Sequence, residues 1–86
     1  MMEILRERLA PLAPARLDIR DDSARHAGHA GAREGGHFVV NIISTRFTGL
    51  STMQRHRLVY DAVGDLMQNG IHALSITAKT PEEVQP

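Results

Sequence analysis

Residues 38–78 decide the fold and read FVVNIISTRFTGLSTMQRHRLVYDAVGDLMQNGIHALSITA. The stretch begins with FVVNII, a β-branched, apolar run broken by one asparagine, which is typical of a central strand. It ends with IHALSITA, whose alternation of side chains predicts a further strand with two different faces. A strict alternation places His72 on the same face as Leu74, Ile76 and Ala78.

A helix is predicted between these two strands, over residues 52–69. Ser51 and Gln54 have the spacing of a capping box, in which a hydroxyl and a side-chain amide satisfy the first free backbone N–H groups. Apolar residues then recur every three or four positions, Arg57 and Asp61 have i,i+4 spacing, and an Asn-Gly pair provides a left-handed stop. Because such a helix acts as a crossover connection, the strands that flank it are predicted to be parallel.

The flanking segments predict shorter elements. Residues 2–12 carry leucines at spacings of four and three and end in prolines, which favours a short amphipathic helix. The alternating residues 17–20 predict a short edge strand, antiparallel to FVVNII. Residues 21–36, DDSARHAGHAGAREGG, show neither the two-residue period of a strand nor the 3.6-residue period of a helix. They predict a long mobile loop. TPEE at residues 80–83 predicts a capped last helix, followed by a disordered tail at residues 84–86.

The predicted order of elements is αββαβ(α). It indicates an α+β fold with a three-stranded mixed sheet covered by helices on one face. With 86 residues and a mass of 9.5 kDa, the chain is expected to form a single domain over residues 1–86. A core of this size leaves no room for a deep cavity between domains, and no catalytic triad or phosphate-binding glycine loop is found, so an enzyme is not expected.

The composition excludes several classes of site. The chain has no cysteine, which excludes disulfides, thiolate zinc sites and an iron–sulfur cluster held by its own thiolates. Ten basic and ten acidic side chains give a formal net charge of zero, so no strong field attracts a polyanion. No apolar run approaches the roughly 20 residues of a membrane span, and no amino-terminal leader is apparent. We therefore expect a cytoplasmic protein with no membrane contact.

The sequence closely resembles the BolA family. The resemblance covers nearly the whole chain, through LDIRDDSARH, HFVVNIISTRFTGLSTMQRHRLVYDAV and IHALSITAKTPEE. Its most specific elements are FTG at residues 47–49, RHR at 55–57 and IHAL at 71–74. The resemblance implies a class II KH-like fold. It also implies a monothiol glutaredoxin as partner and a [2Fe-2S] cluster shared with that partner and glutathione. The chain alone is expected to bind no cluster.

The resemblance further implies that histidines of this chain complete the cluster's ligands. The ligand on the last strand corresponds to His72, and the loop ligand corresponds to His26. An Ala-Gly-His-Ala-Gly insertion places a second loop candidate, His29, three residues further on, and His37 is an additional candidate beside the central strand. Imidazole is chemically reasonable here, since histidine replaces cysteine in Rieske centres, and it must be neutral to bind metal. Cluster transfer should therefore weaken under mildly acidic conditions.

The histidines also have structural interpretations. His72 is equally compatible with a half-buried strand histidine that hydrogen-bonds the backbone. His26 and His29 are compatible with solvated side chains of a mobile loop. The sequence alone does not decide between these interpretations.

A DNA-binding transcriptional regulator is the alternative of a different class. The turn before the long helix resembles a helix-turn-helix, and Arg46, Arg55, Arg57 and Lys79, with His56 on the same surface, are candidates for contacts with nucleic acid. The neutral net charge argues against this function. The competing interpretation is that residues 55–57 brace the preceding FTG turn.

Overall fold

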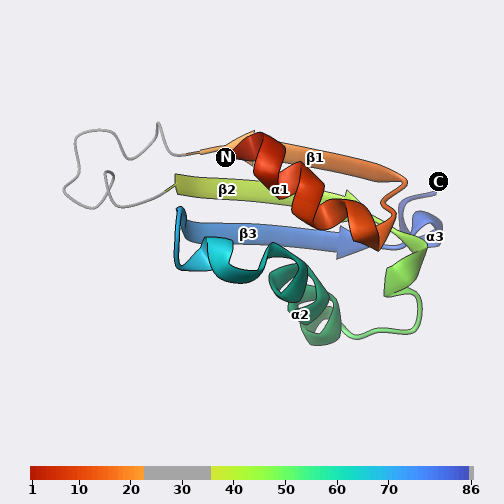
Figure 1. Cartoon of the computed structure of the whole chain (residues 1–86). Helices are drawn as coiled ribbons and strands as arrows, with labels where there is room; N and C mark the ends of the chain where they lie inside the picture. The colour runs from red at the N-terminus through yellow and green to blue at the C-terminus, as the bar shows by residue number, and fades with distance from the viewer. Residues whose placement is uncertain (23–35, 86) are drawn as a thin grey trace.

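The computed structural model describes residues 1–22 and 36–85. Within them the chain forms, in order, α1 (Met2–Leu9), β1 (Arg16–Asp21), β2 (Gly36–Ile43), α2 (Thr52–Val63), β3 (Ile71–Lys79) and α3 (Pro81–Val84) (Figure 1). Short 3-10 turns follow α1, β2 and α2, at Ala10–Leu12, Thr45–Phe47 and Gly64–Met67. This is the order of elements that the sequence predicts.

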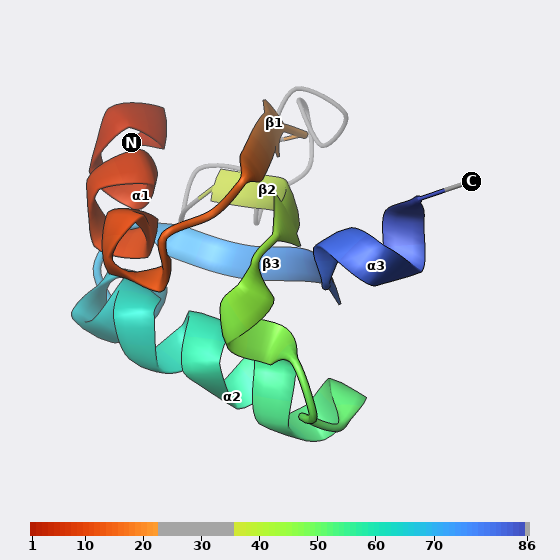
Figure 2. The same ribbon diagram turned by 90° about the vertical axis from the view of Figure 1, so that its right-hand side faces the viewer.

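The described strands form one mixed sheet in the order β1-β2-β3. β1 pairs antiparallel with β2, from Arg16 opposite Ile43 to Asp21 opposite Phe38. β2 and β3 are parallel, because α2 carries the chain back to the end of the sheet where β2 begins. Figures 1 and 2 show α1 and α2 on the same side of the sheet. The predicted α+β class, with a three-stranded mixed sheet and helices on one face, is confirmed.

The core lies between the sheet and the two longer helices. On β2, Phe38, Val40 and Ile42 are buried, whereas Asn41 between them is exposed, as expected for a strand with one covered face. The helices and turns contribute buried apolar side chains at spacings of three and four, namely Leu5, Leu9, Leu12, Phe47, Val59, Val63 and Leu66.

The other face of the sheet, called here the open face, carries the alternate residues of the strands. These residues are exposed or half-buried, and they align in rows because the strands are in register. The open face consists of Arg16, Asp18 and Arg20 of β1, His37, Val39, Asn41 and Ile43 of β2, and Ala73, Ser75, Thr77 and Lys79 of β3.

The long helix is shorter than predicted. α2 begins with the predicted capping box of Ser51 and Gln54 but ends at Val63 instead of residue 69. Gly64 breaks it with φ 62° and ψ −132°, a conformation that favours glycine. Arg8 of α1 donates a hydrogen bond to the Val63 carbonyl at 3.1 Å and so satisfies one of the free carbonyls at the helix end. Leu66 stays buried in the 3-10 turn that follows, so the apolar spacing continues past the end of the α-helix.

The remaining boundaries also differ slightly from the predictions. The segment predicted as a loop is flanked by longer strands, since β1 extends to Asp21 and β2 begins at Gly36. The predicted N-cap at Thr80 begins α3 and forms a capping box with Glu83. The helix includes Val84, a residue assigned to the tail from the sequence. The amino-terminal helix is α-helical only to Leu9 and continues as a 3-10 turn.

Candidate functional site

His72 lies in an irregularity at the start of β3. In the parallel pairing, Gly36 aligns with Ile71 and His37 aligns with Ala73, so His72 is an extra residue on its strand. An extra residue reverses the alternation of faces. Ile71 is therefore buried, with 3% of its surface exposed, and His72 is exposed. The prediction that His72 shares the face of Leu74 was wrong for this reason.

The irregularity brings His72 next to His37. Their ring centroids are 5.1 Å apart, and the two ring planes are tilted by 33°. His37 is half-buried on the open face of β2, and no hydrogen bond joins the ring of His72 to the described part of the chain. The structural interpretation of His72, a half-buried side chain bonded to backbone, therefore does not match its environment. Two imidazoles from neighbouring strands instead meet at one end of the sheet.

This end of the sheet is also where residues 23–35 connect to it. The Asp22 N–H donates to the His37 carbonyl at 2.7 Å, and the Gly36 N–H donates to the Gly70 carbonyl at 3.1 Å. The two loop candidates His26 and His29 belong to this connection and lie outside the described residues. The attachment points of their segment are thus adjacent to the His37–His72 pair in the structure.

In the described ranges, two imidazoles lie side by side at this end of the sheet. No group of three or more His, Cys, Asp or Glu side chains suitable for holding a metal ion occurs in residues 1–22 and 36–85. The His37–His72 pair brings together two imidazole rings from neighbouring strands. This arrangement suits a metal centre whose other ligands come from a second molecule, because iron in a [2Fe-2S] cluster needs further ligands.

The juxtaposition of His37 and His72 follows from sequence features only when they are combined. Each histidine lies near the start of its predicted strand, and the starts of parallel strands meet at the same edge of a sheet. The register irregularity that turns His72 outward has no evident local signal in the sequence. The apolar Ile71 beside it is the one hint, because it competes for the buried position.

Arg55, a candidate for DNA contacts, is used inside the fold. Its guanidinium donates to the Leu50 carbonyl at 3.0 Å and to the Ala78 carbonyl at 3.1 Å. It also binds both carboxylate oxygens of Glu83, at 2.6 and 3.2 Å, and only 13% of its side chain is exposed. The Arg55 hydrogen bond, together with the Thr80 backbone N–H, lowers the pKa of Glu83 from 4.5 to about 2. Arg55 therefore braces the start of α2 against the end of β3 and α3.

The other candidates for DNA contacts lie on separate elements. Arg46 is in the 3-10 turn after β2, Arg57 is on α2 and Lys79 is the last residue of β3, and all three are exposed. His56 is half-buried on α2. The turn before α2 follows a three-residue 3-10 helix, Thr45–Phe47, which comes directly after β2, so its first helix is much shorter than that of a helix-turn-helix.

None of the helices in residues 1–22 and 36–85 has the length and apolar character that crossing a bilayer requires.

Comparisons with known proteins agree with this architecture. The family described as BolA-like protein matches residues 7–83. SufE-like protein 1 of Arabidopsis thaliana, whose name gives a chloroplastic and mitochondrial location, is 46% identical over 93% of this chain. Protein BOLA1, chloroplastic, of the same plant is 45% identical over 92% of it. The matches cover 24% and 52% of these two proteins, so the chain spans only about a quarter and a half of their lengths.

Solved structures give the same result. BolA1 from Arabidopsis thaliana superposes with a TM-score of 0.87 and 43% identity, covering 99% of this chain and 96% of that one. The BolA domain of SufE1 from the same plant has a TM-score of 0.82 and 50% identity, with coverage of 96% and 93%. The order of elements, the mixed sheet and these matches lead to one conclusion: the chain belongs to the family of BolA-like proteins.

Proposed function

We propose that this BolA-like chain is an adaptor that binds a monothiol glutaredoxin and shares or transfers a [2Fe-2S] cluster, in iron–sulfur assembly or iron regulation. The observation that carries the proposal is the position of His72. Its imidazole is exposed, turned away from the core by the irregularity in β3, and close to a second imidazole. A ligand for a cluster held between two proteins must be accessible in this way.

The geometry supports this use of His72 over a structural one. A regular strand would bury His72 and expose Ile71, and the extra residue allows both side chains to take the environment that suits them. Gly70, directly before Ile71, has φ 147°, a conformation that other residues rarely adopt, and its carbonyl accepts the Gly36 N–H. The start of β3 is therefore anchored to β2, and the imidazole of His72 is presented from a fixed backbone.

The second imidazole has three candidates. The resemblance to BolA-like proteins favours His26, with His29 as the other loop candidate. His26 is four residues from Asp22 in the sequence, and the Asp22 N–H donates to the His37 carbonyl at 2.7 Å. His37 is the candidate whose ring lies within 5.1 Å of the His72 ring. Metal–nitrogen bonds of about 2.0–2.1 Å allow two rings at such a spacing to approach one metal ion.

The chain's own contribution to the chemistry is limited to imidazole nitrogens. The glutaredoxin cysteine and glutathione supply the thiolates, since this chain has none. Neutral histidine ligands carry less negative charge than thiolates and raise the reduction potential of a cluster, as in Rieske centres.

The experiment mixes the protein with a cluster-loaded monothiol glutaredoxin and glutathione and follows visible absorption and circular dichroism. The expected result is a new spectrum that His72→Ala abolishes. Parallel substitutions of the other three candidates by alanine identify the second ligand as the one whose loss also abolishes the spectrum. His56→Gln is the matched control, because it removes an imidazole that belongs to α2 and not to the strand starts that carry His37 and His72.

An unchanged spectrum on mixing with the unmodified protein would refute the proposal. The DNA-binding alternative would then gain weight, with Arg46, Arg57 and Lys79 as its exposed cations. Duplex binding that weakens steeply with salt and discriminates between sequences would support it.

A further inference from the structure

β1 is an outer strand of the sheet, because the strand order is β1-β2-β3. The Asp22 N–H donates to the carbonyl of His37 opposite it, and antiparallel strands exchange hydrogen bonds at every second residue. The even-numbered residues of β1 therefore bond to β2, and the N–H and C=O groups of Leu17 and Ile19 point outward. In the part of the chain that the structure describes, no hydrogen bond engages these outward groups.

The opposite edge of the sheet, along β3, is protected by α2, which runs beside it in Figure 1. The Tyr60 hydroxyl donates to the Leu74 carbonyl at 3.4 Å, and the Arg55 guanidinium donates to the Ala78 carbonyl at 3.1 Å. Side chains of the helix thus occupy carbonyls that point away from β2. Natural proteins commonly cover sheet edges in this way, since an open edge pairs with other strands.

The side chains of β1 on the open face alternate in charge. Arg16, Asp18 and Arg20 are exposed, and Asp22 follows directly after the strand. Neighbours along the chain already pair, Arg16 with Asp18 at 2.8 Å and Arg20 with Asp22 at 3.8 Å. A row in which bases and acids alternate can also pair with its own reversed copy, with each base opposite an acid.

We propose that β1 pairs antiparallel with β1 of a second copy of this chain, so that a single sheet runs through both copies. The two-fold axis passes through Ile19, which lies opposite Ile19 of the second copy. Leu17 then lies opposite Asp21 of the second copy. In this register the outward N–H and C=O groups of both strands face one another and form the hydrogen bonds of an antiparallel ladder.

The charges select this register. Asp18 lies opposite Arg20 of the second copy, Arg16 lies opposite its Asp22, and the two-fold axis repeats both pairs. These are the non-hydrogen-bonded positions of the ladder, where opposite Cα atoms are only about 4.5 Å apart. A shift by two residues places Asp18 opposite Asp18 in one direction and Arg20 opposite Arg20 in the other, which is destabilising. The edge carries its own complement, and a second copy is therefore the occupant.

This pairing is independent of the proposed function. The interface belongs to β1, whereas His72 is on β3, the strand at the other edge of the sheet. A failure of the cluster titration with glutaredoxin would leave the pairing of β1 untouched. Monomeric behaviour of the protein would likewise leave the histidine proposal standing.

The test is sedimentation of the full chain from about 10 µM to about 1 mM, where weak association is measurable. The unmodified protein should dimerise with rising concentration. Asp18→Arg and Arg20→Asp each place like charges opposite one another twice, so each variant alone should associate at least about tenfold more weakly. An equimolar mixture of the two variants should restore association, because every charge of one variant then lies opposite its complement in the other.

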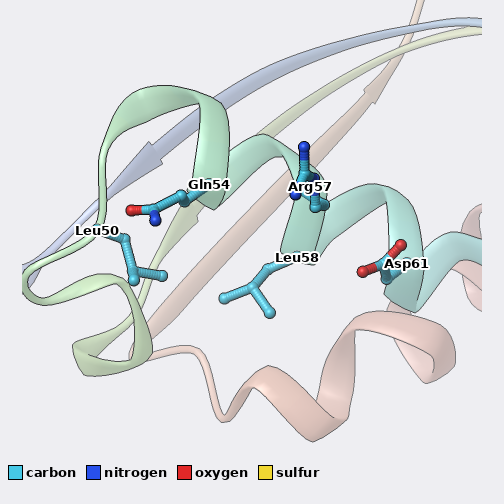
Figure 3. A pocket seen from close by; sticks show the side chains of 5 residues that line it. All are labelled: Leu50, Gln54, Arg57, Leu58 and Asp61. Atoms are coloured by element: carbon cyan, nitrogen blue, oxygen red, sulfur yellow. The ribbon is translucent and has the colours of Figure 1, made fainter.

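Two kinds of control accompany these variants. Asp18→Arg/Arg20→Asp in one chain keeps the charges complementary and should retain the dimer. Asp61→Arg and Arg57→Asp change the net charge equally but lie on α2, beside a hollow of about 400 Å³ (Figure 3), and should leave association unchanged. All four positions are exposed, so none of the variants should disturb the fold.

Amide hydrogen exchange locates the interface. The N–H groups of Leu17 and Ile19 should exchange more slowly as the protein concentration rises, because the ladder protects them. The N–H of Ile76, at the edge of β3, should exchange at an unchanged rate.

Several results would overturn the proposal. One is sedimentation as a monomer over the whole concentration range, and another is a dimer that Asp18→Arg and Arg20→Asp leave intact. A mixture of these variants that associates no better than either alone would refute the register. Association weakened by Asp61→Arg, or concentration-dependent protection at Ile76 in place of Leu17, would place the interface elsewhere and equally refute the pairing of β1.

Discussion

The brace formed by Arg55 gives a prediction whose magnitude can be worked from the structure. The side chain is 13% exposed, and it makes two hydrogen bonds to backbone carbonyls and a two-pronged ion pair with Glu83. Arg55→Ala removes all of these and leaves the carbonyls of Leu50 and Ala78 without this donor. Hydrogen bonds that involve a charged donor contribute about 1.5–3 kcal/mol each. The contributions of several bonds from one side chain are not additive, so the free energy of unfolding is expected to fall by about 2–4 kcal/mol.

This loss is large for a small domain. Stabilities of about 0.05–0.15 kcal/mol per residue give roughly 4–13 kcal/mol for the whole chain. At about 4–8 °C per kcal/mol, Arg55→Ala should lower the midpoint of thermal unfolding by roughly 10–30 °C. The assay is unfolding in denaturant and by heat, followed by circular dichroism.

Two matched variants separate the brace from a simple loss of charge. Arg57→Ala removes a neighbouring arginine that is exposed, and it should change stability by no more than about 0.5 kcal/mol. Arg55→Lys keeps the charge but lacks the planar guanidinium group that binds both carboxylate oxygens, so it should recover only part of the lost stability. Equal midpoints for Arg55→Ala and Arg57→Ala would refute the reasoning. The same comparison matters for any DNA-binding assay, in which loss of binding in Arg55→Ala would report unfolding.

Three further predictions concern single side chains. Because the pKa of Glu83 falls to about 2 in the fold, its ion pair stabilises the protein above about pH 4.5. This stabilisation is lost as the pH drops toward 2. Glu83→Gln should therefore flatten the plot of melting temperature against pH between these two values. Gly64→Ala should cost about 1–3 kcal/mol in denaturant unfolding, since φ is 62° and a Cβ there would lie 3.1 Å from the Arg8 guanidinium. Ser44→Ala should cost about 1–3 kcal/mol, because the fully buried hydroxyl donates to the Leu12 carbonyl at 2.6 Å.

Local patterns predicted the elements of this fold well, for identifiable reasons. FVVNII combines β-branched residues with flanking turn residues, and the capping boxes at Ser51 and Thr80 depend on side chains three residues apart. Such features are contained in a few consecutive residues. The topology then follows, because a crossover helix makes the flanking strands parallel.

The errors arise where distant parts of the chain decide the local conformation. The apolar spacing runs through Gly64 to Leu66, so periodicity alone places the end of α2 too late; the helix ends at Val63, where Gly64 takes φ 62° and Arg8 of α1 binds the last carbonyl. The Arg55 brace joins residues 50, 55, 78 and 83, which only the tertiary fold brings together. Long-range contacts of this kind leave no periodic signal.

The candidate site was likewise predicted only in part from the sequence. The resemblance pointed to His72, and its exposed position is compatible with that proposal, but its face on β3 was predicted incorrectly. His26 and His29 lie outside the described residues, so their proposed function as ligands stays a prediction. The proximity of His37 and His72 could be expected qualitatively, because the starts of parallel strands lie at the same edge of a sheet. The 5.1 Å distance between their ring centroids depends on the register of β2 and β3.

The irregularity in β3 links the stability of the fold to the proposed chemistry. Leu74 is buried, so regular alternation from it would bury His72 and expose Ile71. Burying Ile71 contributes to the core, while exposing His72 avoids the cost of desolvating an imidazole without a hydrogen-bond partner. The extra residue satisfies both demands at one position. The same backbone feature therefore secures the edge of the core and leaves the imidazole exposed, as the proposed function requires.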